Sequence, residues 1–158
     1  MRLSASTRRW LARITAPRRR KPAGKKRHAA IALKAPRLRL LMHLGRIRVY
    51  LVNATAVRKM TDKNPNAVDY TMASHWGVWP TIVSKNEIWV SDELGPPRNP
   101  LEMNLTILHE AAEARRMLKD KLSYDDAHDE SLALEDKYRK ANGRGLMAAL
   151  RAEARRWK

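Results

Sequence analysis

The sequence predicts an α+β domain in which a small antiparallel sheet is followed by two antiparallel helices and a basic C-terminal helix. Two observations support this prediction. Between residues 46 and 90, short segments rich in β-branched and aromatic residues are separated by polar turns. From residue 100 onward, longer segments carry apolar residues at helical spacing. Strand-like segments therefore come first and helical segments second, the order expected of an α+β fold.

The chain of 158 residues has the length of one domain, but its net charge of +17 is distributed unevenly. The 18 Lys and Arg residues that precede Asp62 are accompanied by no acid, whereas the other 15 face all 16 Asp and Glu residues. We therefore predict a basic, partly disordered arm over residues 1–45 and a single, nearly neutral domain over residues 46–158. Within the arm, residues 29–45 are more apolar and are expected either to pack on the domain as a helix or to lie along a partner.

The sheet is predicted from three segments. Arg46–Val52 is β-branched and partly alternating, which is typical of a strand. A short helix over residues 53–60 follows, and residues 69–80 are expected to be irregular or strand-like. Thr81–Val83 and Glu87–Val90 are predicted as two short strands joined in a hairpin by three polar residues.

Three helices are predicted after the sheet. The first spans residues 101–121, with Asn99 as its N-cap and Pro100 in its first turn. The second begins at a Ser123 cap and ends at an Asn-Gly pair. The connection between these two helices is short, so they should pack antiparallel. The third helix, over residues 146–157, is basic and amphipathic.

A cluster of His and Glu residues on the first two of these helices is the clearest sign of chemistry. His109 and Glu113 are four residues apart, so a helix places them on one face, one turn apart, with Glu110 beside them. His128 lies early in the second helix, where it can face Glu113. Two imidazoles and a carboxylate form a ligand set for zinc, and Glu110 remains for proton transfer.

The same residues also have a simpler interpretation. Ion pairs on the helix surface with Arg115, Arg116 and Lys119 would explain Glu110 and Glu113 equally well. The chain contains no Cys, so a metal ion would have to be bound by His and carboxylate groups, and a reducing compartment is compatible with the sequence.

Three further residues lie within expected reach of the site. Glu135 is two turns after His128 on the same helix face and can contact a metal ligand without binding the metal itself. His75 is a candidate fourth ligand or substrate-orienting group, although a hydrogen-bonded structural role is favoured. Tyr124 is expected to pack between the helices rather than to stabilise an oxyanion.

A resemblance to a known family covers residues 49–139 and excludes the arm. It is carried, in chain order, by Val49-Tyr50-Leu51-Val52-Asn53, Val57-Arg58, Asp69-Tyr70-Thr71, His75, Asn86-Glu87-Ile88-Trp89-Val90, Leu108-His109-Glu110, Glu113, Met117, Tyr124, Ala127-His128 and Glu135. These motifs resemble a family of short, mostly uncharacterised proteins of bacteriophages and their bacterial relatives, which looks like a minimal zinc metallopeptidase (a zincin).

The resemblance implies that His109, Glu113 and His128 bind zinc and that Glu110 is the general base. The chain departs from common zinc peptidases in having Glu113 where they carry a second His. A zinc-dependent hydrolase acting on an amide bond is therefore the first functional expectation. The alternative is a non-enzymatic structural component of a virion or nucleoprotein particle, in which a structural or vestigial metal site fixes two helices.

The arm has the composition of a polyanion-binding segment. Seven of its basic residues form two groups, four between a pair of prolines and three after the glycine that follows: Arg18, Arg19, Arg20, Lys21, Lys25, Lys26 and Arg27. Such a segment favours non-specific binding to nucleic acid. It could instead contact other proteins of a virion or nucleoprotein particle, or act as a mitochondrial transit peptide. No apolar run is long enough for a membrane span, and we expect a location in the bacterial host cytoplasm or in the virion.

Overall fold

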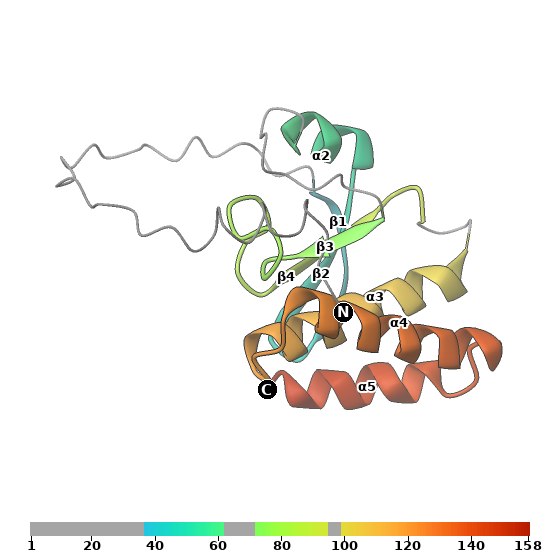
Figure 1. The fold of residues 1–158 in the computed structure, drawn as a ribbon. Helices are drawn as coiled ribbons and strands as arrows, with labels where there is room; N and C mark the ends of the chain where they lie inside the picture. The colour runs from blue at the N-terminus through green and yellow to red at the C-terminus, as the bar shows by residue number, and fades with distance from the viewer. Residues whose placement is uncertain (1–36, 62–71, 95–98) are drawn as a thin grey trace, which may run out of the picture. The chain divides into compact units, whose positions relative to one another are not determined.

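A computed structural model describes residues 37–61, 72–94 and 99–158 (Figure 1). The elements in chain order are β1 (Arg37–Leu44), β2 (Ile47–Val52), α2 (Ala54–Thr61), β3 (Ala73–His75), β4 (Glu87–Ser91), α3 (Pro100–Leu118), α4 (Tyr124–Lys140) and α5 (Leu146–Arg156). The strands form a four-stranded sheet and the three long helices follow it, which confirms the predicted α+β class. In the described part of the chain, no helix is both long and apolar enough to cross a membrane.

The sheet is mixed, so the prediction of an antiparallel sheet was wrong for one strand pair. Its strand order is β1-β2-β4-β3. β1 pairs with β2 and β3 pairs with β4 in antiparallel fashion, but β2 and β4 are parallel. Between β2 and β4 the chain passes through α2 and β3. Parallel neighbouring strands require such a long connection, because a tight hairpin turn can join only antiparallel strands.

The predicted hairpin does not form. Residues 81–83 turn back on themselves, and the backbone N–H groups of Ile82 and Val83 donate to the carbonyl of Trp79 at 3.1 and 2.8 Å. β4 instead lies between β2 and β3, and all five of its residues are buried. A short apolar segment is compatible with either a strand or a turn, and here its hydrogen bonds are made locally.

The sheet begins earlier than predicted, because residues 37–44 form the edge strand β1 and not a helix. A buried ion pair ties this strand to the sheet. The Glu87 side chain is 2% exposed, and its carboxylate accepts hydrogen bonds from Arg37 at 2.6 Å, Arg48 at 3.0 Å and the Trp89 indole N–H at 3.0 Å. A buried carboxylate is tolerated when donors satisfy it in this way. The basic character of the segment therefore contributes to the fold.

α3 is the helix around which the rest of the domain is arranged. It contacts β3 and β4 on the sheet, and α4 and α5 also pack against it. Its fully buried apolar residues are Leu105, Ile107, Leu108, Ala111, Ala112 and Ala114. The caps are as predicted: Asn99 accepts from the Glu102 N–H at 3.2 Å and Ser123 accepts from the Asp126 N–H at 3.1 Å. α3 and α4 run antiparallel (Figure 1), which aligns the end of one with the start of the other.

The turn between β1 and β2 lies against the C-terminal end of α5. Gly45 has a φ of +58°, and a Cβ placed on it would lie 2.5 Å from the Ala154 carbonyl oxygen. The Arg46 N–H donates to the Trp157 carbonyl at 3.1 Å, and the Trp157 indole N–H donates to the Ala111 carbonyl at 3.3 Å. Only glycine allows this approach, so Gly45 joins the sheet to the helical layer.

Candidate metal centre

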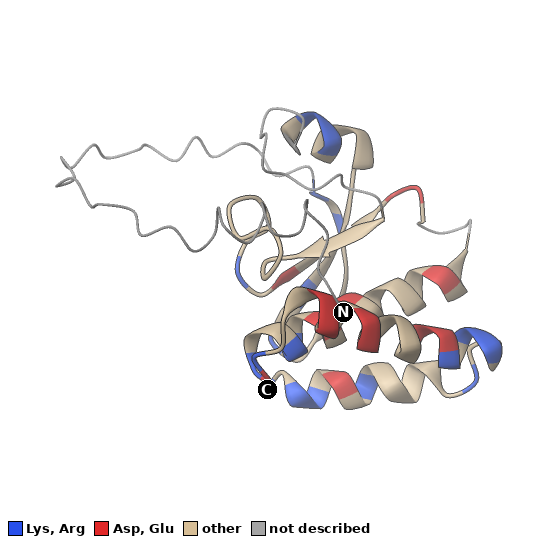
Figure 2. Ribbon diagram, viewed as in Figure 1, with Lys and Arg blue, Asp and Glu red and all other residues tan. Residues whose placement is uncertain are grey.

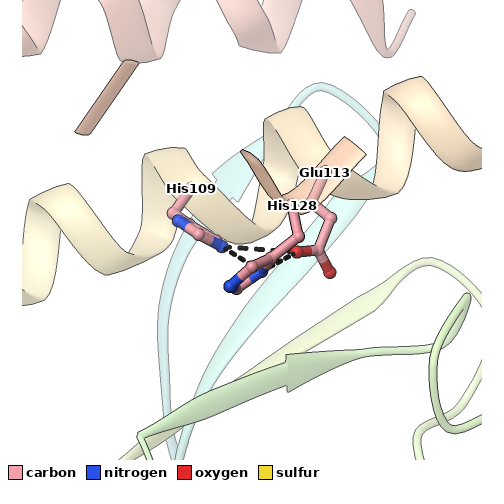
Figure 3. Close-up of side chains that lie close together, drawn as sticks. All are labelled: His109, Glu113 and His128. Carbon is pink, nitrogen blue, oxygen red and sulfur yellow. Dashed lines mark hydrogen bonds and ion pairs between the residues drawn. The ribbon is translucent and has the colours of Figure 1, made fainter. Parts of the chain in front are cut away.

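The two histidines and the glutamate predicted as metal ligands converge where α3 meets the start of α4 (Figure 3). The Glu113 Oε2 atom lies 2.7 Å from His128 Nδ1 and 3.3 Å from His109 Nε2, and the two ring nitrogens are 3.3 Å apart. His109 and Glu113 are 6% and 3% exposed, whereas the His128 side chain is 37% exposed. The group is thus buried on the α3 side and accessible from α4.

These separations match what a metal ion requires. Bonds of about 2.0–2.1 Å in a tetrahedral zinc site place neighbouring ligand atoms about 3.3 Å apart. Two of the three distances have this value, and the third, between Glu113 and His128, is a short hydrogen bond that would lengthen by about half an ångström. The three residues can therefore hold a metal ion with little movement of the helices.

His75 comes from the end of β3 and fixes the orientation of Glu113. It is fully buried, and its Nε2 atom lies 2.9 Å from Glu113 Oε1. Its other ring nitrogen, Nδ1, accepts a hydrogen bond from the Gly77 backbone N–H at 3.0 Å. Because Nδ1 is an acceptor, Nε2 carries the proton and donates it to Glu113. His75 therefore holds one oxygen of Glu113 and leaves the other facing the two histidine ligands.

This arrangement also decides between two groupings of metal-binding side chains. His75, Glu110 and Glu113 are close enough to form a second candidate triad. The Nε2 atom of His75 is a donor, however, and a metal ligand must offer a lone pair. Gly77 maintains this state, because a Cβ at that position would lie 2.9 Å from His75 Nδ1. We therefore assign His75 to positioning Glu113, in line with the structural role favoured from sequence.

Glu135 positions His109 from the opposite side. Its Oε2 atom lies 2.9 Å from His109 Nδ1, and its other oxygen is bound by Arg139, which also pairs with Glu102 at 2.8 Å. A carboxylate that accepts from one ring nitrogen of a ligand histidine fixes the tautomer, so that the other nitrogen offers its lone pair. Glu135 is within reach of the ligands as predicted, and the chain Glu102-Arg139-Glu135-His109 extends this support to the domain surface.

The electrostatics of the cluster favour a bound cation. Burial opposes ionisation of Glu113, but hydrogen bonds from His109, His75 and His128 outweigh it and hold the pKa of Glu113 well below its usual range. The hydrogen bond from His109, opposed in part by burial and reinforced by Arg139, lowers the pKa of Glu135 to about 2. Burial disfavours a charge on His109, yet its bonds to Glu113 and Glu135 raise its pKa to about 9. Glu113 and Glu135 are thus both ionised, and the positive charge that balances them is the proton on His109. A metal ion bound to the cluster can supply this positive charge instead.

Glu110 has the properties expected of a proton acceptor next to this centre. The Glu110 carboxylate lies close to the Glu113 carboxylate and to the His75 ring. Burial of the carboxyl group, partly offset by His75 and reinforced by Glu113, raises the pKa of Glu110 to about 7. A carboxyl group with a pKa near neutrality can both accept and return a proton at physiological pH.

Tyr124 occupies a different position from the one expected. Its side chain is exposed rather than packed between helices, and its ring stacks on His128 with centroids 5.5 Å apart and planes 22° apart. Burial of the hydroxyl group and the nearby carboxylates of Glu113 and Glu110 raise the pKa of Tyr124, so the phenol stays neutral. Tyr124 therefore restrains His128, the member of the cluster that is partly open to solvent.

The alternative interpretation from sequence, in which Glu110 and Glu113 form surface ion pairs with nearby cations of α3, does not fit the contacts that these cations make. Arg115 pairs with Asp120 and Glu153, and Arg116 pairs with Glu130 at 2.6 Å. These cations thus engage acids other than Glu110 and Glu113, and Lys119 donates to a backbone carbonyl at the end of α5.

Sequence reasoning missed Arg139 and Gly77. Arg139 lies one helical turn after Glu135 and could have been found from that spacing, whereas Gly77 shows its role only once His75 is placed. The seven basic residues predicted to bind nucleic acid, between Arg18 and Arg27, lie outside the described residues. Comparisons of the chain with family models, with curated proteins and with solved structures find no match.

Proposed function

We propose that this protein is a zinc-dependent hydrolase that acts on amide bonds, as its resemblance to the phage metallopeptidase-like family implies. The observation that carries the proposal is the convergence of His109 Nε2, Glu113 Oε2 and His128 Nδ1 within 3.3 Å of one another, beside a carboxyl group with a pKa near 7. A metal triad with an adjacent proton acceptor is the minimal equipment for metal-assisted hydrolysis.

The ligand chemistry supports zinc over other common metals. Two imidazole nitrogens and one carboxylate oxygen form a known catalytic zinc set, which leaves a fourth position for water or substrate. Calcium and magnesium prefer oxygen ligands, and a site with two nitrogens suits them poorly. The His128 side chain is 37% exposed, which supports a fourth position that water or substrate can reach.

The roles of the protein groups follow from their contacts. When bound, zinc would lower the pKa of a water molecule towards about 7. Glu110 accepts the proton of the attacking water and returns it to the leaving nitrogen. His75 and Glu135 hold Glu113 and His109 in the orientation that offers one lone pair each. The bond that breaks is the C–N bond of the amide, and the water supplies a hydroxyl to carbon and a proton to nitrogen.

The charge around the site supports an amide over a phosphodiester substrate. The first half of α4, which carries His128, also exposes Asp125, Asp126, Asp129 and Glu130 (Figure 2). A carboxylate-rich rim repels a polyphosphate chain. A neutral or cationic peptide segment is therefore the substrate class that we propose.

The second candidate function is structural, and the location of the cluster between two helices favours it. A metal ion held by α3 and α4 would fix these helices in a virion or nucleoprotein component without catalysis. A saturated coordination shell would support this alternative. The open side at His128 and the raised pKa of Glu110, which a purely structural site does not need, favour the enzyme.

We also propose that the basic arm brings the domain to nucleic acid or to a nucleoprotein assembly, in the cytoplasm of a bacterial host or in a virion. The absence of acids before Asp62 supports this proposal. Removal of residues 1–27 should then weaken binding and flatten its dependence on salt.

Metal content and proton transfer can be tested separately. Purified protein saturated with zinc and then dialysed should retain one zinc ion per chain, and His109→Ala should retain none. Glu110→Gln should keep the zinc and lose cleavage of a mixed peptide library, detected as new amino termini by mass spectrometry. Glu93→Gln, which alters an exposed ion pair with Arg58 after β4, is the matched control and should retain both. Absence of bound zinc in the unmodified protein contradicts the proposal, and cleavage that survives Glu110→Gln removes the assigned base.

A further inference from the structure

A strip of cations runs along the exposed face of α5 and has no role in the proposed hydrolysis. It contains Arg144, just before the helix, followed by Arg151, Arg155 and Lys158, all of which are exposed. Arg151 and Arg155 are four residues apart within α5, so they project from one side of the helix, and Arg144 and Lys158 flank its two ends. The 11 residues of α5, which these cations line and flank, span about 16 Å.

The acid and the apolar residues of α5 face the other way. Glu153 is the only acid of the helix, is 3% exposed and pairs with Arg115 at 3.0 Å and Arg156 at 3.1 Å. Leu146 and Leu150 are buried in the core. The exposed strip therefore carries positive charge, while the one acid of α5, whose place on the ribbon is the red band between the blue ones in Figure 2, has a buried side chain.

Two more cations extend the strip at the end of α5. The Lys119 amine lies 4.6 Å from the centre of the Trp157 ring and donates to the Arg156 carbonyl. The Arg46 guanidinium lies 6.0 Å from the same ring, while its backbone N–H is bonded to Trp157. Three segments that are distant in sequence thus bring their charges together on one surface.

We infer that this surface binds the phosphate backbone of nucleic acid. A strip of about 16 Å spans roughly five base pairs of duplex, which offers several phosphates to four or more cations. An anionic membrane fits less well, because a helix that lies in a membrane surface needs a free apolar face, and that of α5 is already buried in the core. The contact would be to phosphates and would not depend on base sequence.

The position of α5 also determines how a bound polymer would lie relative to the metal centre. α5 contacts α3 through Ala111 and Arg115, which follow His109 and Glu113 by two residues each. Two residues correspond to about 200° around a helix. The strip and the metal centre are thus on opposite sides of α3, and nucleic acid bound to α5 would leave the acidic rim of the site open to a peptide.

The inference is tested with the full chain, since the basic arm is also expected to bind. The combined variant Arg144→Ala, Arg151→Ala and Arg155→Ala is compared with Lys59→Ala, Lys85→Ala and Lys140→Ala, which removes the same charge from exposed sites elsewhere. Binding to a labelled duplex of about 20 base pairs is measured by fluorescence anisotropy over a range of salt concentrations, and each lost phosphate contact lowers the salt slope by about 0.9.

The α5 variant should lower the salt slope by between about two and three, whereas the control should change it by less than about one. Thermal melts check that both variants are folded. An unchanged slope for the α5 variant overturns the inference, and so does an equal decrease in both variants, because that reflects net charge alone. Loss of binding to vesicles with anionic lipid, while duplex binding is retained, would overturn it in favour of a membrane.

Discussion

Replacement of Glu135 tests whether the hydrogen-bond network of the site serves a metal ion. The carboxylate lies 2.9 Å from His109 Nδ1 in a largely buried position. Glu135→Gln keeps an oxygen that can accept this hydrogen bond but removes the charge. A hydrogen bond to a charged group contributes about 1 kcal/mol more than a neutral one, and 1.4 kcal/mol corresponds to a factor of ten. We therefore expect zinc affinity to fall roughly fivefold.

Glu135→Ala should have the larger effect, because it leaves His109 without the group that orients it. Loss of such an orienting partner lowers metal affinity by about 10–100-fold, so the alanine variant should lie near the upper end. Affinities are measured by competition with a chromogenic zinc chelator at neutral pH. Glu130→Gln is the control, since its exposed ion pair with Arg116 should contribute little, and we expect a change of less than about twofold. Wild-type affinity in Glu135→Ala, or an equal loss in the control, would show that Glu135 does not orient His109 for a metal ion.

Three further predictions concern the fold and its coupling to the site. Gly45→Ala should lower the free energy of unfolding by about 2–5 kcal/mol in urea titrations, because a positive φ and a 2.5 Å approach to a carbonyl both oppose a Cβ. Gly145→Ala, with φ +81° but no close neighbour, should cost only about 1–2 kcal/mol, and equal losses would contradict the assigned packing. His75→Gln, which can still donate to Glu113, should bind zinc more tightly than His75→Leu, and the reverse order would argue against the donor role. In chelator-treated protein, the raised pKa of His109 gives stability that is complete below pH 6.5 and is lost as the pH rises through about 9. The Tm should therefore fall across this interval without zinc and change less with it; a rising Tm would contradict the assignment.

The helices and the His/Glu cluster were predictable because local rules determine them. The caps at Asn99 and Ser123 depend on contacts three residues away, and His109 and Glu113 meet through the turn of one helix. The short connection between α3 and α4 was enough to bring His128 to Glu113. The partner of His75 could not be read in this way, because Glu113 is 38 residues distant in sequence.

The sheet was less predictable because its pairing depends on distant residues. β1 was assigned to the arm on account of its charge, but Arg37 is held by Glu87, 50 residues away. Leu38 and Leu40 are exposed on this edge strand, so its apolar residues do not mark a face buried in the core. The parallel pairing of β2 with β4 likewise follows from the connection through α2 and β3, which the apolar pattern of residues 81–90 did not indicate.

The central claim is that His109, Glu113 and His128 bind one zinc ion. Anomalous scattering from zinc-saturated crystals, recorded on both sides of the zinc absorption edge, tests it most directly. We predict one strong peak within about 2.0–2.2 Å of His109 Nε2, Glu113 Oε2 and His128 Nδ1, with a fourth position facing solvent. The absence of a peak there, or a peak bound by His75 and Glu110 instead, would contradict the account.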